Sequence, residues 1–412
     1  MLAHVLTFSS DGDDKFFEDV PTAPSVFLLR GEGEPYVSKT ANLRRRLQRL
    51  LGKPAEQSRR LNLRARVSEI EFTLTGSDFE SQFLLYRLLR EAFPKTYAAR
   101  LRLRPAPLVK LHLENEYPRA SVTTRLGRID FGERGVSRAL VDADSTGEGA
   151  RASTYRKGNL YYGPFPSRIA AEKFASDALD FFKMRRCVDD LHPDPSFPGC
   201  VYSEMKMCLA PCYKGCTDAE YHAEVARVQA FFDSCGESLN RELAGQRERA
   251  SAQLAFEQAS TIHAKIEKLK VLLSQLPEIV QSIDRLAAII VQPSAQEGRV
   301  ELFQFSNATF RGPIPFSIEQ SGEPQSMEAR LRALIETFAS PGAGSAVERT
   351  EHLAILKRWY YRSHRVGEIF FADEKGAWPL RKMVRGIARV YRGEKEQEPA
   401  SLSPTEARSP SS

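Results

Sequence analysis

Clustered cysteines limit the fold of this chain more than any other feature of the sequence. Cys187, Cys200, Cys208 and Cys212 lie within 26 residues, and Cys216 follows. The N-terminus lacks a basic start followed by an apolar run, so we expect no secretion signal and a cytoplasmic chain without a disulfide framework. Thiols clustered in that compartment indicate a bound metal, with buried, metal-free cysteines as the alternative. The Cys-x2-Cys pairs of a zinc ribbon are missing, so the identity of the metal stays open.

Composition sets broad limits on class and partner. The chain has 412 residues, 42% hydrophobic and 27% charged, which is enough for several globular domains. No apolar run approaches the roughly 18–20 residues of a membrane-spanning helix. The net charge is only +6, but residues 30–66 hold eleven Lys/Arg against three Glu. That local surplus predicts a nucleic-acid partner, and a solvated basic helix face is the alternative.

The first hundred residues predict a small α/β domain. The chain shows alternating apolar positions typical of strands, turn residues at Glu32–Pro35, and helix N-caps at Asn42 and Ser77. The predicted elements are a strand over residues 24–30, a strand from Tyr36, a helix over Leu43–Leu51, a strand over residues 67–74 and a helix from Ser77 to about Glu91. We place this domain at residues 20–103 of an α/β multidomain chain.

The rest of the chain divides by pattern into four segments. These are a connector with the cysteine cluster at 104–217, a long helical hairpin at 218–275, an α+β domain at 280–392 and a disordered tail at 393–412. Within the connector, residues 127–158 read as a charged, Gly-rich loop. The hairpin is predicted as two helices, Asp218–Ala244 and Arg247–Ser274.

Two further patterns have both a functional and an ordinary explanation. In the second predicted hairpin helix, Phe256, Ala259, Ile262 and Ile266 fall on one apolar stripe, which either packs inside the hairpin or docks on a partner. In the last domain, basic and aromatic residues alternate, as in Arg358–Arg362. Such clusters bind nucleic acid or belong to an ordinary half-buried helix, and no carboxylate and histidine set there indicates catalysis.

Several motifs, in order, resemble the UvrC family of excision-nuclease subunits. Ser25-Val26-Phe27 and Tyr36-Val37-Ser38 resemble the two strand motifs of its GIY-YIG nuclease domain, and the run Lys39–Leu47 resembles the segment that follows them. Further matches are Tyr117–Arg119, Tyr162–Ser167, the cysteine tract and Leu254–Ala259. The resemblance covers roughly residues 20–320. It omits the family's second nuclease and helix-hairpin-helix domains, as in short, Cho-like relatives.

The resemblance implies a nuclease site that has lost part of its chemistry. Tyr36, Lys39 and Arg46 match catalytic positions, whereas Phe27 stands where the family has a tyrosine and Leu85 where it has the metal-binding glutamate. Magnesium or manganese would serve only an active enzyme. We therefore predict weak or no cleavage, unless Glu80 replaces the missing carboxylate.

The resemblance also implies ligands and partners. We expect DNA to bind the basic residues Lys39, Arg44, Arg45, Arg46 and Arg49. An iron–sulfur cluster, or zinc as the alternative, would be held by Cys187, Cys200, Cys208 and Cys212. The partner protein UvrB would dock on Phe256, Ala259, Ile262 and Ile266. The function implied is DNA binding in nucleotide excision repair, and the alternatives are an active structure-specific endonuclease making one incision and a scaffold without DNA affinity.

Overall fold

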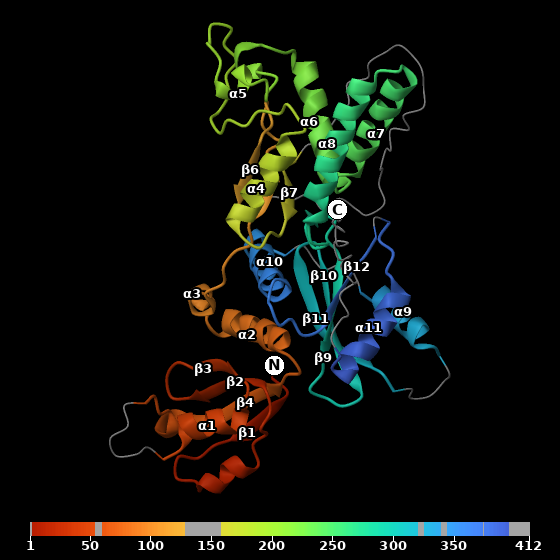
Figure 1. Cartoon of the computed structure of the whole chain (residues 1–412). Coiled ribbons are helices and arrows are strands. Elements are labelled where there is room, and N and C mark those ends of the chain that lie inside the picture. Colours follow the sequence, from red (N-terminus) through yellow and green to blue (C-terminus); the bar gives the residue numbers. More distant parts are fainter. Residues whose placement is uncertain are drawn as a thin grey trace, which may run out of the picture.

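A computed structural model describes residues 2–53, 60–127, 158–319, 325–338, 344–373 and 375–394 of the chain. Most of the loop predicted at 127–158 and the predicted tail from residue 395 onward lie outside these residues. The mixed α/β class is confirmed, because the described part contains three antiparallel four-stranded sheets together with helices (Figure 1). None of the described helices is long and apolar enough to cross a membrane.

The N-terminal sheet has the strand order β1–β4–β2–β3. Its strands are β1 (His4–Thr7), β2 (Ser25–Gly31), β3 (Tyr36–Thr40) and β4 (Val67–Leu74). Strands β2, β3 and β4 lie where the alternating pattern predicted them, whereas β1 was not predicted. Helix α1 (Leu43–Leu51) covers one face, where Leu43 and Leu47 are buried against strand residues such as Phe27.

Local capping explains where the first two long helices begin. The Asn42 side chain accepts a hydrogen bond from the Arg45 amide, and the Ser77 side chain accepts one from the Glu80 amide at the start of α2 (Asp78–Ala92). The predicted capping box is only half formed. The Glu80 carboxylate accepts from the Gly76 amide instead of the Ser77 amide.

Helix α2 lies between the N-terminal sheet and the C-terminal sheet (Figure 1). The second of these has the order β11–β10–β9–β12, from β9 (Ala288–Pro293), β10 (Arg299–Ser306), β11 (Thr309–Ser317) and β12 (Glu368–Phe371). The Phe79 ring packs edge-on against the Phe303 ring, with 4.9 Å between the ring centres, and the Phe83 and Phe310 ring centres are 5.5 Å apart. A helix of the first domain therefore contributes to the core of the last one.

Helices flank the C-terminal sheet and the third sheet. Around the C-terminal sheet lie α9 (Met327–Glu336), α10 (Ala346–Tyr360) and α11 (Leu380–Arg392). The third sheet has the order β6–β5–β7–β8, from β5 (Leu108–Leu111), β6 (Ala120–Thr123), β7 (Leu160–Gly163) and β8 (Gln281–Ser282). Helix α3 (Tyr97–Leu101) precedes this sheet, α4 (Arg168–Leu179) packs on it, and α5 (Val201–Glu204) lies in the cysteine tract. Short 3-10 turns occupy Asp14–Glu18, Arg64–Arg66 and Pro211–Tyr213.

The predicted pair of long helices is instead three helices. They are α6 (Asp218–Asp233), α7 (Glu237–Ala252) and α8 (Phe256–Ser274). The first break falls at Gly236, whose φ of +91° is accessible mainly to glycine, and a Cβ there would lie 2.6 Å from a Leu273 methyl carbon. The second break is at Leu254, with a φ of +58°. The helical hairpin is thus formed by α7 and α8.

Candidate nucleic-acid interface

Tyr36 and Arg46 meet on the α1 side of the N-terminal sheet. The Arg46 Nη2 atom donates a hydrogen bond of 2.7 Å to the Tyr36 hydroxyl, and both residues are half-buried. Phe27 lies opposite Ser38 in the neighbouring strand, is fully buried, and has its ring 6.1 Å from the Tyr36 ring. Two residues of the predicted site therefore come together, while the third motif position contributes only to the core.

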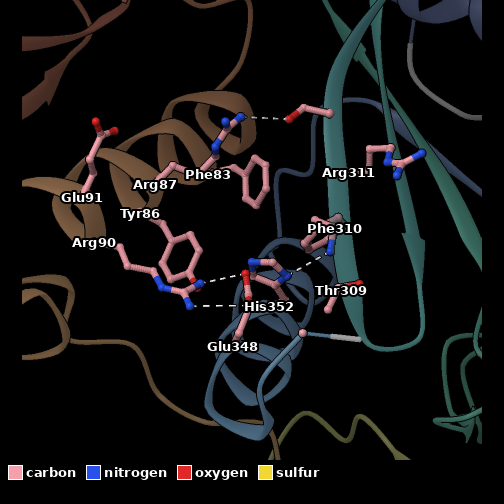
Figure 2. Close-up of a pocket in the computed structure, with 12 residues that line it drawn as sticks. Phe83, Tyr86, Arg87, Arg90, Glu91, Thr309, Phe310, Arg311, Glu348 and His352 are labelled. Atoms are coloured by element: carbon pink, nitrogen blue, oxygen red, sulfur yellow. Dashed lines mark hydrogen bonds and ion pairs between the residues drawn. The ribbon is translucent and has the colours of Figure 1, made fainter. Parts of the chain in front are cut away.

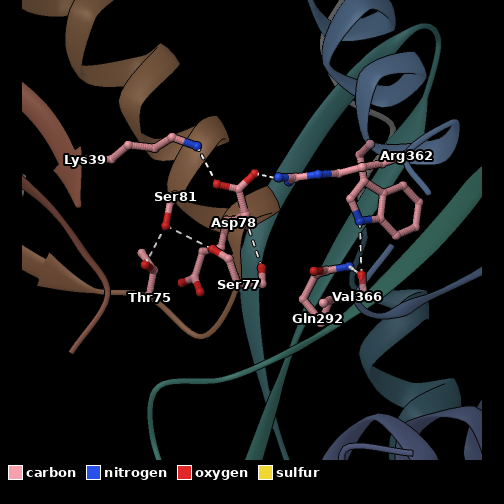
Figure 3. Close-up of polar contacts among 10 residues, drawn as sticks. Lys39, Thr75, Ser77, Asp78, Ser81, Gln292, Arg362 and Val366 are labelled. Carbon is pink, nitrogen blue, oxygen red and sulfur yellow. Dashed lines mark hydrogen bonds and ion pairs between the residues drawn. The ribbon is translucent and has the colours of Figure 1, made fainter. Parts of the chain in front are cut away.

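Lys39 lies on the other face of the same strand. It is three residues beyond Tyr36, and alternate strand residues face opposite sides. Its Nζ atom is 2.6 Å from Asp78 Oδ1, at the start of α2, and Arg362 binds the second oxygen of this carboxylate (Figure 3). Burial alone would raise the pKa of Asp78, but hydrogen bonds and charges from Lys39 and Arg362 hold this pKa below its usual value. Lys39 is thus separated from Tyr36 and Arg46.

No local pattern predicts that Asp78 and Arg362 form a pair, because they are 284 residues apart. Each residue belongs to a local sequence pattern that does not indicate the other. Asp78 follows the helix cap at Ser77, and Arg362 belongs to the basic and aromatic cluster at 358–362.

The carboxylates of α2 have contacts other than the Tyr36–Arg46 pair. Glu80 is 5% exposed and accepts a 2.8 Å hydrogen bond from the Gly76 amide. Leu85 is half-buried against the core that α2 shares with the C-terminal sheet, and Glu91 is exposed at a cavity. Within the described ranges, no carboxylate hydrogen-bonds to Tyr36 or ion-pairs with Arg46.

Burial of Glu80 has a consequence for stability. Desolvation, opposed by the Gly76 hydrogen bond and reinforced by the nearby Glu301 carboxylate, raises the pKa of Glu80 to about 7. Because the pKa is higher in the folded state than the ordinary value of 4.5 for a glutamate, the folded state holds this proton more tightly. The corresponding stability is present at low pH and is lost as pH rises from about 4.5 to 7.

We therefore expect Glu80→Gln to stabilise the chain above pH 7, by at most about 3 kcal/mol, and to change little near pH 4. Urea unfolding at pH 5 and pH 8, for wild type and variant, measures this difference. An unchanged pH dependence in the variant would show that Glu80 is not the titrating group.

The basic residues of α1 divide into two groups. Arg44 is engaged by the fold, since its Nε donates 2.7 Å to the Val20 carbonyl and its Nη2 donates 2.6 Å to that of Glu18. Arg46 binds Tyr36. Arg45 and Arg49 are exposed and have no ion-pair partner among the described residues. Of the five predicted DNA contacts, these two are the ones open to solvent and not held by the protein itself.

A cavity of about 590 Å³ lies where α2, β11 and α10 meet (Figure 2). The Nδ1 atom of His352, which is 3% exposed, accepts a hydrogen bond of 2.9 Å from the Phe310 amide, and burial lowers the pKa of His352 to about 4. Arg90 pairs with Glu348 at 2.7 Å. These polar and charged groups hydrogen-bond or ion-pair with one another across the junction. We therefore assign the cavity wall a structural role.

The four predicted metal-binding cysteines are half-buried and near one another. Buried Arg185 donates a 3.3 Å hydrogen bond to Cys187 Sγ, and the Ala210 amide donates one of 3.2 Å to Cys208 Sγ. Burial, opposed by the Ala210 hydrogen bond and reinforced by the three other thiols, raises the pKa of Cys208 to about 11. In the part of the chain described, no three His, Cys, Asp or Glu side chains are arranged to hold a metal ion.

The predicted partner-binding stripe is divided along α8. Ile262 and Ile266 are 6% and 4% exposed and belong to the same core cluster as α7 residues, and Ala259 is half-buried. Phe256 is 67% exposed and Leu254 is 71% exposed, next to the turn between α7 and α8. Of the predicted stripe, Phe256 at the tip of the hairpin is therefore the exposed member, and elsewhere on α8 Val271 is 58% exposed.

Comparison with known proteins finds one matching family model and several curated relatives. Residues 141–231 match the family model described as "UvrC/Cho excinuclease, middle domain". The chain is a UvrC-like, Cho-like protein.

Curated relatives called UvrABC system protein C align over most of the chain. The protein from Idiomarina loihiensis is 27% identical over 62% of this chain and 37% of its own length. Those from Stenotrophomonas maltophilia and Rickettsia bellii are each 26% identical over 78% of this chain, and over 48% and 46% of their own lengths. The chain thus spans less than half the length of these relatives. No solved structure matches it.

Proposed function

We propose that this chain is a DNA-binding protein of nucleotide excision repair. Its N-terminal domain binds the phosphates of DNA but cleaves DNA weakly or not at all. The relatives support the repair role, since each is a component of a UvrABC system by name. The observation that carries the second half is the position of the α2 carboxylates. Glu80 is buried at the domain junction and Asp78 is bound by Lys39 and Arg362.

The chemistry of phosphodiester cleavage explains why this matters. The magnesium or manganese ion of such an enzyme needs a carboxylate ligand, and the ion neutralises charge on the phosphate and leaving group. No carboxylate of the described residues hydrogen-bonds to Tyr36 or ion-pairs with Arg46. An arginine fork without a metal still binds a phosphate oxygen pair, so binding can persist where cleavage does not.

Binding of the intact chain to a fluorescent DNA duplex at several salt concentrations tests the proposal. We expect an affinity that falls linearly with salt on logarithmic axes, as counterions are released from phosphates. No binding at low salt would overturn the proposal and would favour a scaffold without DNA affinity. The alternative function, an endonuclease making a single incision, is supported by the Tyr36–Arg46 hydrogen bond, which brings two of the predicted catalytic residues together.

We propose further that the tip of the α7–α8 hairpin docks on UvrB through Leu254 and Phe256. Phe256→Ala is expected to weaken a pull-down by purified UvrB about tenfold or more, as loss of an aromatic anchor does, without lowering the melting temperature. Ile262→Ala is the matched control, because that side chain is buried and its loss should lower stability first. Equal UvrB capture by wild type and Phe256→Ala would contradict the docking proposal.

The cysteine tract is proposed to hold an iron–sulfur cluster through Cys187, Cys200, Cys208 and Cys212. Supporting this, the four thiols are close enough to affect one another's pKa, and the buried Arg185 and the Ala210 amide donate to two of the sulfurs. When bound, such a cluster would fix this loop-rich segment. Protein isolated without oxygen should contain iron and sulfide, and Cys212→Ser should lose both and unfold at a lower temperature. Stoichiometric zinc without iron would contradict this assignment.

A further inference from the structure

We propose that the end of α10 forms a second phosphate-binding surface, which lies beside Lys39 of the N-terminal domain, across the domain junction. We call it the α10 surface and define it by Arg358 and Arg362. The inference rests on the proposed DNA binding and extends it to the C-terminal domain, where the ligand is the sugar-phosphate backbone of DNA.

The first support is charge. Residues 352–367 contain Lys357, Arg358, Arg362 and Arg365 and no aspartate or glutamate. Arg358 and Arg362 are exposed and four residues apart, at the end of α10 and just beyond it. Arg362 lies two residues beyond Tyr360, the last residue of α10, so both arginines lie at the exposed C-terminal end of this helix. Arg358 has no ion-pair partner in the described part of the chain. Two guanidinium groups therefore face solvent together.

The second support is that this segment is held rigidly. Trp359 is 6% exposed, and its Nε1 atom donates 3.1 Å to the Val366 carbonyl, which also accepts 3.0 Å from Gln292 Nε2. The Tyr361 hydroxyl donates 2.9 Å to the Pro164 carbonyl. A surface ordered before binding loses less entropy when a ligand arrives.

The aromatic residues of the cluster are used by the fold. The Arg365 guanidinium lies 5.2 Å from the centre of the Trp359 ring and 4.9 Å from that of Tyr360. These rings are therefore not free to stack on bases. Contacts from the α10 surface would be to phosphates, and such contacts position a duplex without reading its sequence.

The third support is continuity with the N-terminal domain. Arg362 and Lys39, from different domains, bind the two oxygens of Asp78 (Figure 3). Two cations on one carboxylate leave a net positive charge, and this bridge is accessible, because the Asp78 and Arg362 side chains are 51% and 54% exposed. A DNA phosphate that reaches Lys39 from the N-terminal domain therefore meets Arg362 as well.

DNA fits this surface better than an acidic protein does. The guanidinium forks match paired phosphate oxygens, and a protein partner would also need an apolar contact area. The exposed neighbours Ser363 and His364 are polar, and Val366, which is 53% exposed, is a single apolar side chain and too small for such a contact area.

The test compares wild type with Arg358→Gln/Arg362→Gln by duplex binding at several salt concentrations. We expect the variant to bind about tenfold more weakly near 0.2 M salt, with a salt slope reduced by about two. An exposed bridge contributes little to stability, so its melting temperature should be unchanged. The matched control is Arg381→Gln/Arg385→Gln, which removes the same charge from two exposed arginines of α11.

The outcomes separate this inference from the proposed function. If wild type binds DNA and both double variants bind as wild type does, or weaken equally, the α10 surface is refuted while DNA binding stands. If wild type does not bind at all, the proposed function fails first. Weakening confined to Arg358→Gln/Arg362→Gln supports the α10 surface.

Discussion

Replacing Arg45 and Arg49 with glutamate is expected to weaken duplex binding by about tenfold or more and to lower the salt slope by about two. Both side chains are exposed on α1 and have no ion-pair partner among the described residues. Each can therefore release counterions from one phosphate. The reversal adds repulsion to the lost contacts, so the effect should exceed that of neutral substitutions.

The neighbouring Arg44 serves as a control for folding. Its guanidinium donates to the Val20 and Glu18 carbonyls, so Arg44→Ala should lower the free energy of unfolding, by about 1–3 kcal/mol for hydrogen bonds from a charged group. Thermal melting beside the binding titration distinguishes the two effects. If Arg45→Glu/Arg49→Glu bound DNA as wild type does, α1 would not be the DNA-binding face.

Local chemistry explains what the sequence could predict. Strand β4 alternates apolar and polar residues over residues 67–74, and it has those bounds in the structure. The N-caps at Asn42 and Ser77 act through bonds to residues three positions ahead, which depend only on nearby sequence. The separation of Tyr36 from Lys39 also follows from strand periodicity, because residues three apart in a strand face opposite sides. The family motif, which places both residues in one site, does not show this separation.

Long-range packing explains what could not be predicted. Phe79 and Phe303 are more than two hundred residues apart, and no local pattern indicates that α2 joins two sheets. The same packing determines where Glu80 lies. In the hairpin, the breaks at Gly236 and Leu254 depend on positive φ values that the surrounding helical pattern conceals. The apolar stripe along α8 could be predicted from the sequence. The burial of its residues by a neighbouring helix could not.

The second large effect concerns catalysis. Removing a group that stabilises transition-state charge costs on the order of 100- to 1000-fold in rate, and if Leu85 replaces the only metal carboxylate, as proposed, the cost should be at least as large. Phe27 also lacks the hydroxyl that the family has at that position. We therefore expect no metal-dependent cleavage above background by this domain, even when DNA is bound.

The central claim is that the chain binds phosphates without holding a catalytic metal. A nicking assay on duplex and branched DNA, with magnesium or manganese titrated, tests it most directly. Wild type, Glu80→Gln and Tyr36→Phe should all leave the DNA intact at concentrations where wild type binds it. Metal-dependent nicking by wild type that disappears in Glu80→Gln and Tyr36→Phe would contradict the claim.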